Sequence, residues 1–289
     1  MNQHEVARHV AVGDTQLYIV ERGAGYPLLV LHGGPGLDHH EFGDYLDALG
    51  DRYRLILVDL RGQGLSAPAA EATLTLEQMA VDVSALALAL GLARYAVLGH
   101  SYGAFVALQH AVQFPGAAAQ TIISSGIPSA RFLAVIEANL QAFAPVELRE
   151  QVMASWARER DAAMPEDVAA IMHDQMPFHF ADPHDPRIAE FEARTAGAVY
   201  APDVLRYFAR QEYGAIEVEA ALPGITQPLL VLAGRHDRTC SVAAADAIAH
   251  GAPHAKLIVF EQSGHMTYVE ENARYLAVVR AFLDQYAGG

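Results

Sequence analysis

The sequence predicts an α/β fold in which a mostly parallel sheet carries helices on both faces. Three observations support this prediction. Short apolar runs bounded by glycine or polar residues recur along the chain, as expected for strands that are buried on both faces. Segments with helical spacing follow most of these runs, and repeated strand–helix units form parallel sheets. One long segment, residues 128–222, interrupts the alternation and has only helix-like apolar spacing.

The first part of the chain has the pattern of strands. Residues 9–12 and 16–21 flank a short turn that begins with a Gly-Asp pair, so they predict a hairpin. A continuous apolar run over residues 27–31 leads into a glycine-rich segment and predicts a buried strand. Residues 41–49 have the apolar spacing of a helix, so the first strand–helix unit is expected here.

Strand and helix patterns alternate through the middle of the chain. Thr75 precedes a helical pattern and Gln78 follows three residues later, which predicts an N-cap with a capping box. Helices are expected over residues 75–90 and 102–114. The strands expected around them are residues 53–59, 95–98 and 121–125.

The segment of residues 128–222 is rich in Ala, Glu and Arg and has no convincing strand. We interpret it as a helical cap inserted into the sheet domain, with a loop over residues 177–187 because of its prolines and aspartates. Strands at residues 229–233 and 257–260, each followed by a helix, restore the alternation. The expected domains are a core of residues 1–127 and 223–289 and a cap of residues 128–222.

Composition excludes several classes of function. The 289 residues include 19 Lys and Arg against 34 Asp and Glu, a net charge of −15, which disfavours nucleic acid and anionic membranes as partners. The single cysteine, Cys240, excludes an intrachain disulfide and a cysteine-based zinc site. The first residues lack a signal-peptide pattern, and the longest apolar stretch, residues 83–93, is too short to span a bilayer. A cytoplasmic protein is expected.

The pentapeptide Gly99-His100-Ser101-Tyr102-Gly103 lies between an expected strand and an expected helix. This is the context that the G-x-S-x-G pattern requires. The glycines allow a sharp turn that presents the serine hydroxyl above the sheet, and the helix N-terminus favours negative charge there. Ser101 is therefore the candidate nucleophile.

A serine hydroxyl needs a base, and the base needs an orienting acid. Asp237 follows the expected strand at residues 229–233, and His265 follows the next strand. The carboxyl ends of parallel strands meet at one edge of the sheet, where ligands bind. We therefore predict His265 as the base and Asp237 as the acid that orients it.

Two backbone N–H groups are needed to stabilise an oxyanion. The N–H of Tyr102, directly after the nucleophile, is the first candidate. The second comes from the segment His32-Gly33-Gly34-Pro35-Gly36, where Pro35 has no N–H to donate. Gly34 is the preferred donor and Gly33 the second choice.

These motifs, together with Asp59-Leu60-Arg61-Gly62-Gln63-Gly64-Leu65-Ser66, resemble the α/β-hydrolase superfamily and, within it, the proline iminopeptidase (prolyl aminopeptidase) branch. The resemblance covers residues 10–127 and 223–286. It implies a mostly parallel eight-stranded sheet with the cap inserted after the sixth strand. It also implies a serine hydrolase without cofactor or metal that acts on a small molecule or short peptide through an acyl-enzyme.

One position departs from that branch, whose members hold the substrate's α-amino group with glutamates, typically one next to the catalytic aspartate and others in the cap. Here Arg238 follows Asp237, and a cation repels an ammonium group. Glu212 is a possible cap carboxylate for the amino group. Arg238 could instead meet a substrate carboxylate or pair with an acid of the cap. The candidate substrate-binding residues are Gly33, His100, Glu212 and Arg238.

Two questions of function stay open at this point. The loop motif favours a small peptide or amide substrate, whereas Arg238 favours an ester or lactone. A small-molecule receptor on the same fold is a third possibility, because fold alone does not determine function. The adjacent His39 and His40 are not expected to form a metal site, because neighbouring histidines rarely converge on one ion and no carboxylate has suitable spacing.

Overall fold

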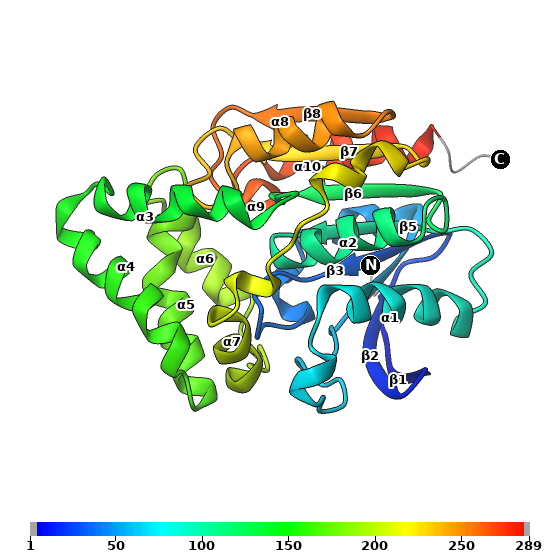
Figure 1. Ribbon diagram of the computed structural model, residues 1–289, viewed down its shortest axis with the longest axis horizontal. Coiled ribbons are helices and arrows are strands. Elements are labelled where there is room, and N and C mark those ends of the chain that lie inside the picture. Colours follow the sequence, from blue (N-terminus) through cyan, green and yellow to red (C-terminus); the bar gives the residue numbers. More distant parts are fainter. Residues whose placement is uncertain (1–4, 286–289) are drawn as a thin grey trace.

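Eight strands form one sheet in the computed structural model, which describes residues 5–285 (Figure 1). Their order across the sheet is β1-β2-β4-β3-β5-β6-β7-β8. The β1–β2 and β2–β4 pairs are antiparallel and all other pairs are parallel, which confirms the predicted mostly parallel sheet. The strands are β1 (Val6–Val12), β2 (Thr15–Arg22), β3 (Tyr26–Leu31), β4 (Tyr53–Val58), β5 (Ala96–His100), β6 (Gln120–Ser124), β7 (Leu229–Gly234) and β8 (Ala255–Phe260).

Helices cover both faces of this sheet and bury it. Apolar side chains of α1, α2 and α8 pack on one face, while α10 and residues 39–51 pack on the other. Every residue of the central strands β5 and β6 is buried, which explains their continuous apolar sequences. The helices of this layer arrangement are α1 (Leu76–Ala89), α2 (Tyr102–Gln113), α8 (Val242–Gly251), α9 (Thr267–Glu270) and α10 (Asn272–Asp284).

The segment between β6 and β7 forms the helical cap, which lies at one end of the sheet in Figure 1. Its two ends are hydrogen-bonded to each other, because the N–H of Val218 donates to Pro128 and the N–H of Ala130 donates to Ile216. The chain therefore leaves the core and returns to it at the same place. The cap helices are α3 (Ala134–Gln141), α4 (Val146–Arg158), α5 (Pro165–His179), α6 (Arg187–Arg194) and α7 (Pro202–Ala209).

Two predicted elements differ in the structure. Residues 41–49 do not form an α-helix but two 3₁₀ turns, His39–Phe42 and Asp47–Asp51. Gly43 has a φ of 48° and ends the first turn, so the helical hydrogen-bond ladder cannot continue through it. The predicted loop at residues 177–187 is also shorter than expected, because α5 continues through His179 and α6 begins at Arg187.

At the N-terminus of helix α1, the structure shows only one of the two hydrogen bonds of the predicted capping box. The Thr75 side chain accepts the N–H of Gln78 at 3.1 Å, as an N-cap does. The Gln78 side chain does not reach back to Thr75. It donates instead to Asp82, one turn further along the helix. The pattern therefore predicted the start of the helix correctly, and the capping box was wrong.

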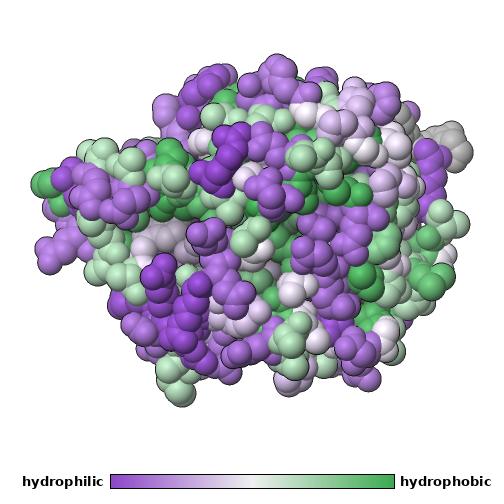
Figure 2. All heavy atoms as spheres, viewed as in Figure 1, coloured by the Kyte–Doolittle hydropathy of each residue, from purple (hydrophilic) through white to green (hydrophobic). Residues whose placement is uncertain are grey.

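Hydrophilic residues are spread over both the core and the cap on the face of the molecule in Figure 2, in keeping with the net charge of −15. None of the helices between residues 5 and 285 combines the length and the apolar character needed to cross a bilayer. Residues 1–4, part of the segment without a signal-peptide pattern, lie outside the described residues.

Candidate active site

Ser101 lies at a sharp turn between β5 and α2. Its backbone has φ 52° and ψ −119°, a strained conformation for a residue with a side chain. Neighbouring chains approach closely here. A Cβ on Gly99 would lie 2.1 Å from the carbonyl oxygen of Gly103, and a Cβ on Gly103 would lie 2.3 Å from that of Leu31. Both glycines of the pentapeptide are therefore required by packing, and together they present Ser101 at the edge of the sheet.

Asp237 and His265 follow β7 and β8 and meet beside Ser101. Nδ1 of His265 lies 2.8 Å from Oδ2 of Asp237. Oδ1 of Asp237 accepts the N–H groups of Thr239 and Cys240 at 2.9 and 2.8 Å, so the carboxylate is held on both sides. The hydroxyl of Thr239 donates to the same oxygen and also lies 2.9 Å from Nδ1 of His265. The arrangement fixes the imidazole with its Nδ1 toward the acid.

The electrostatics of the pair favour a charged imidazole. Burial alone would raise the pKa of Asp237, but the neighbouring His265 and the backbone donors lower it to about 2. Burial alone would lower the pKa of His265, and the charge and hydrogen bond of Asp237 outweigh this and raise it. Asp237 therefore stays ionised at neutral pH, where its charge favours the protonated form of the His265 imidazole.

Two further histidines pack against the ring of His265. The rings of His100 and His179 both lie with centroids 5.0 Å from that of His265. Burial lowers the pKa of His100 well below its usual value and that of His179 to about 3. Both neighbours are therefore neutral at pH 7, and they enclose the base without repelling its charged form.

The N–H groups predicted for the oxyanion differ in their availability. The N–H of Gly33 donates to the carboxylate of Glu41 and is occupied. Gly34 has a φ of 107° and lines the same cavity as Ser101. Its N–H has no acceptor among the described residues, and the N–H of Tyr102 has none within α2 because Tyr102 opens that helix. Gly34 and Tyr102 are thus the available pair.

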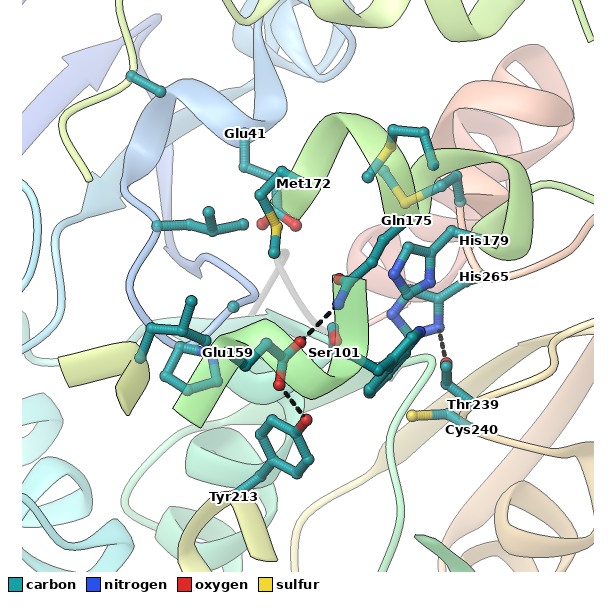
Figure 3. Close-up of a pocket in the computed structure, with 18 of the residues that line it drawn as sticks. Glu41, Ser101, Glu159, Met172, Gln175, His179, Tyr213, Thr239, Cys240 and His265 are labelled. Carbon is teal, nitrogen blue, oxygen red and sulfur yellow. Dashed lines mark hydrogen bonds between the residues drawn. The ribbon is translucent and has the colours of Figure 1, made fainter. Parts of the chain in front are cut away.

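Ser101 and His265 open into a cavity of about 130 Å³ between core and cap (Figure 3). In the described structure the Ser101 hydroxyl makes no hydrogen bond, and catalytic hydrogen bonds often tighten only when substrate is bound. Most side chains that line the cavity are apolar. Among residues 5–285, its formally charged side chains other than histidine are the carboxylates Asp38, Glu41 and Glu159, and neither a lysine nor an arginine of these residues lines it.

Glu41 lies beside Ser101. A Cβ on Gly33 would lie 2.6 Å from Oε1 of Glu41 and 3.2 Å from Cβ of Ser101, so the carboxylate and the serine flank the same point. Glu41 is only 8% exposed. Burial raises its pKa to about 7, although the hydrogen bond from Gly33 lowers the pKa. A buried carboxylate without a cation is costly, so this position has a strong preference for a cationic partner.

Glu159 is a second buried carboxylate, and it comes from the cap. One of its oxygens accepts from the Gln175 amide at 2.6 Å and the other accepts from the Tyr213 hydroxyl (Figure 3). Its exposed fraction is 3%, and burial raises its pKa to about 7 despite both donors. Each oxygen keeps a lone pair, so Glu159 can also accept from a ligand.

None of the four predicted substrate-binding residues belongs to the described lining of the cavity. Glu212 is exposed on the cap, and the cap carboxylate that lines the cavity is Glu159. His100 lies behind His265, with Nδ1 3.3 Å from the Ser124 hydroxyl. The N–H of Gly33 donates to the carboxylate of Glu41 and is not free for a substrate. The fourth residue, Arg238, points into the cap backbone.

Arg238 holds a short stretch of cap backbone, residues 178–181, which we call the cap clasp. Its Nη1 donates to the carbonyls of Phe178 at 3.0 Å and Phe180 at 2.5 Å, and its Nη2 donates to that of Ala181 at 3.1 Å. Burial lowers the pKa of the guanidinium. All three bonds go to backbone oxygens, so neither of the two roles considered for Arg238, a substrate carboxylate or a cap acid, describes its contacts.

The cap clasp also contacts the loop that carries His265. The N–H of His265 donates to the carbonyl of His179 at 2.7 Å. The carboxylate of Glu270 accepts the N–H of Ala181 at 2.8 Å and that of Gly264 at 2.7 Å, and thus joins the cap to the loop. The backbone around His265 is therefore partly held by the cap.

The Arg238→Met variant is expected to lose about 2 kcal/mol of unfolding free energy, because it leaves buried carbonyls of the cap clasp without donors. Urea unfolding followed by circular dichroism measures this. Arg235→Met is the matched control, since Arg235 only forms an exposed ion pair with Glu261 and its loss should leave stability unchanged. Equal stability of both variants would contradict the structural role of Arg238.

Three residues of the site are not predicted by the sequence. Glu159 stands in the charged run Arg158-Glu159-Arg160-Asp161, which has the appearance of a solvated helix end. Glu41 lies in a segment interpreted as an ordinary helix, and no motif marks it. Thr239 was detectable in principle, because a hydroxyl two residues after a loop aspartate often bonds that aspartate.

Comparison with known proteins places these observations in context. The family model described as "alpha/beta hydrolase fold" matches residues 26–272. The chain is 28% identical over 271 residues to a proline iminopeptidase of Heyndrickxia coagulans, an alignment that covers 91% of this chain and 92% of that protein. Several other proline iminopeptidases match at 25–27% identity.

Solved structures of a proline iminopeptidase and of an esterase are also similar to this chain. The crystal structure of a proline iminopeptidase from Mycobacterium smegmatis superposes with a TM-score of 0.75 at 26% identity and covers 98% of this chain and 99% of that one. A thermophilic esterase from Thermogutta terrifontis superposes with a TM-score of 0.74 at 22% identity, with coverage of 98% and 99%. At that identity the second likeness concerns the fold alone.

Proposed function

The chain belongs to the α/β-hydrolase fold family, in a branch similar to proline iminopeptidases, and on this premise we propose that it is a serine aminopeptidase. Its substrate would be a short peptide or small amide with a free amino group, and it would release the N-terminal residue, proline or one of similar size. The observation that carries the proposal is the charge of the cavity, whose lining among the described residues includes the buried carboxylates Asp38, Glu41 and Glu159 and no lysine or arginine.

The proposed reaction proceeds through an acyl-enzyme. His265 takes the proton of Ser101, and the oxygen of Ser101 bonds to the carbonyl carbon while the N–H groups of Gly34 and Tyr102 stabilise the oxyanion. The C–N bond then breaks, and His265 gives its proton to the departing amine. Water hydrolyses the ester of Ser101 by the same steps, with His265 again as base. Asp237 stays ionised throughout.

Glu41 is better placed than Glu159 to hold the α-ammonium group. In an aminopeptidase substrate the ammonium is separated from the scissile carbonyl by a single carbon, so its partner must lie beside the nucleophile. Glu41 meets that requirement, because its carboxylate and the Ser101 side chain flank Gly33. An ammonium group there would supply the charge that the buried carboxylate lacks.

The size of the cavity also supports a small acyl part. An apolar cavity of about 150 Å³ holds a molecule the size of benzene. The cavity next to Ser101 encloses about 130 Å³, so it suits a proline ring or a small aliphatic residue. A longer chain on the acyl side of the scissile bond would not fit without movement of the cap.

The Glu41→Gln variant tests the proposal. We expect kcat/KM for proline p-nitroanilide to fall about 100-fold, because loss of one partner of a buried ion pair is strongly unfavourable. Turnover of p-nitrophenyl acetate, which has no amine, should change less than threefold. Glu150→Gln, an exposed glutamate on α4, is the matched control and should leave both substrates unaffected. Equal losses on anilide and ester would remove Glu41 as the amine partner.

A small ester or lactone is the second candidate substrate. Most of the cavity wall is apolar, and the carboxyl groups of Glu41 and Glu159 have a pKa of about 7, so each is neutral for part of the time at neutral pH. A neutral apolar cavity suits an ester. If wild type hydrolyses p-nitrophenyl acetate and butyrate but not proline p-nitroanilide, the carboxylesterase function replaces the aminopeptidase function.

A further inference from the structure

Hydrogen bonds hold the main chain on both sides of the His265 side chain. The N–H of His265 donates to the carbonyl of His179 at 2.7 Å, and its carbonyl accepts the hydroxyl of Ser125 at 2.9 Å. The N–H of the preceding residue, Gly264, donates to the carboxylate of Glu270 at 2.7 Å. These three bonds fix the main chain from which the imidazole extends.

Glu270 is a buried carboxylate that the proposed reaction does not use. It is the last residue of α9 and is 7% exposed. Its Oε2 accepts the N–H of Gly264, and its Oε1 accepts the N–H of Ala181, in the cap clasp, at 2.8 Å. A carboxylate accepts on both oxygens, whereas a carboxamide has one acceptor oxygen. Glu270 is therefore suited to join two N–H donors, one from the core and one from the cap.

The cap clasp contacts the loop of His265 through its main chain and through a ring. A Cβ on Gly264 would lie 2.5 Å from the carbonyl oxygen of His179, so the clasp and the loop approach each other closely. The ring of His179 packs against that of His265, with the centroids 5.0 Å apart (Figure 3). Close packing of this kind transmits displacements, so a shift of the clasp also shifts the imidazole.

Charged groups from the cap and the core surround Glu270. Nη1 of Arg187, in α6, donates to the carbonyl of Glu270, and Arg187 forms an ion pair with Asp185. Burial lowers the pKa of Arg238, and the charge of Glu270 opposes this effect. Burial raises the pKa of Glu270 to about 7, although both N–H donors lower it. When ionised, Glu270 raises the pKa of His265.

We propose that Glu270 is a positioning residue of the catalytic site, which joins Gly264 to the cap clasp and thereby keeps the imidazole of His265 at Ser101. Glu270 is not among the described residues that line the cavity, so it acts through its neighbours. Its influence passes through the main chain of Gly264 and through the carbonyl and ring of His179. The inference rests on the proposed acyl transfer, because it needs His265 as the base.

Two adjacent glutamates provide the test. Glu271 holds the same loop, but its Oε2 alone accepts the N–H of Gln262 at 3.1 Å and the hydroxyl of Ser263 at 2.8 Å. In Glu271→Gln the amide oxygen can therefore keep both bonds. In Glu270→Gln it can keep only one, because the two N–H donors of Glu270 use different oxygens. The two variants thus make the same chemical change, and only one of them breaks a link between loop and cap.

We expect Glu270→Gln to lower kcat about tenfold or more and to leave KM near its wild-type value, because small displacements of a catalytic group are costly. The acid limb of kcat/KM should move to lower pH, since one charge that raises the pKa of His265 is removed while Asp237 and Glu41 remain. Glu271→Gln should keep the wild-type kcat and acid limb. Equal effects of the two substitutions, or an unshifted acid limb in a folded Glu270→Gln protein, would overturn the proposal.

Glu270→Asp replaces Glu270→Gln if circular dichroism shows that the latter is misfolded. Its carboxylate keeps the charge but is shorter by one methylene group, so it cannot span both N–H donors. The proposal predicts a lower kcat with the acid limb in its wild-type place. A wild-type kcat in this variant would contradict the positioning role.

The rate at which a fluorophosphonate labels Ser101 separates this inference from the proposed function, because labelling needs no peptide substrate. If wild type is labelled about tenfold faster than Glu270→Gln but does not turn over proline p-nitroanilide, the aminopeptidase function is wrong and the positioning role stands. If proline p-nitroanilide is turned over and both proteins are labelled at the same rate, the function stands and the positioning role is wrong. A wild type that is neither labelled nor active would overturn both.

Discussion

The Ser101→Ala variant is expected to lose hydrolytic activity by a factor of about 10⁴ or more while it keeps its fold. The nucleophile, base and acid of such a site act as one unit, so removal of the nucleophile alone removes most of the catalysis. The backbone at position 101 has a φ of 52°, and alanine is as unfavourable there as serine, so stability should change little.

This expectation is measured by kcat/KM on the substrate found for wild type, by covalent labelling with a fluorophosphonate, and by thermal unfolding. Ser84→Ala is a suitable control, because it removes a half-buried hydroxyl that bonds His110 and does not line the cavity. It should be labelled and active. A Ser101→Ala protein that is still labelled, or that retains wild-type turnover, would show that another residue is the nucleophile.

The Asp237→Asn variant is expected to lower kcat about 10⁴-fold at neutral pH, because an amide stabilises the wrong tautomer of His265 and no longer supports its positive charge. The pH profile should change as well. In wild type His265 must be neutral to act as a base, so activity falls as the pH drops through its pKa. That pKa is raised above 6.5, chiefly because the Asp237 charge and hydrogen bond outweigh burial.

Without the charge and the hydrogen bond of Asp237, the lowering effect of burial is opposed only by the weaker influence of the Glu41 and Glu270 carboxylates, and the pKa of His265 moves down. The acid limb of kcat/KM should therefore shift to lower pH in Asp237→Asn, in addition to the loss of rate. Asp246→Asn, at an exposed position on α8, is the matched control. It should retain both the wild-type rate and the wild-type acid limb of the kcat/KM profile. An unshifted acid limb in an otherwise folded Asp237→Asn protein would mean that another group determines the profile.

The parts of the fold and site that the sequence predicts are those with short-range causes. The strands β3 to β8 are expected within two residues at each end, because buried parallel strands give continuous apolar runs. The strand–serine–helix order places Ser101, and chain order places Asp237 and His265 at the same sheet edge. These positions depend only on local spacing in the sequence and on the order of the strands in the sheet, for which few arrangements are possible.

The parts that the sequence does not predict depend on tertiary contacts. Glu159 is buried only because α5 and Tyr213 cover it, and no pattern in its own charged neighbourhood indicates that. The substrate-facing role considered for Arg238 fails for the same reason, since the carbonyls that bind it lie 57–60 residues away in the chain. Residues 41–49 have helical spacing, yet Gly43 breaks the ladder.

The cap clasp has a consequence for how such a protein can diversify. The main-chain N–H of His265 donates to the carbonyl of His179, and Glu270 joins the same cap segment to Gly264. An exchange of the cap for that of a relative would therefore alter the support of His265 along with the shape of the cavity. Chimaeras that graft residues 128–222 need to retain the backbone path of residues 178–181, so that new specificity and an intact catalytic loop are inherited together.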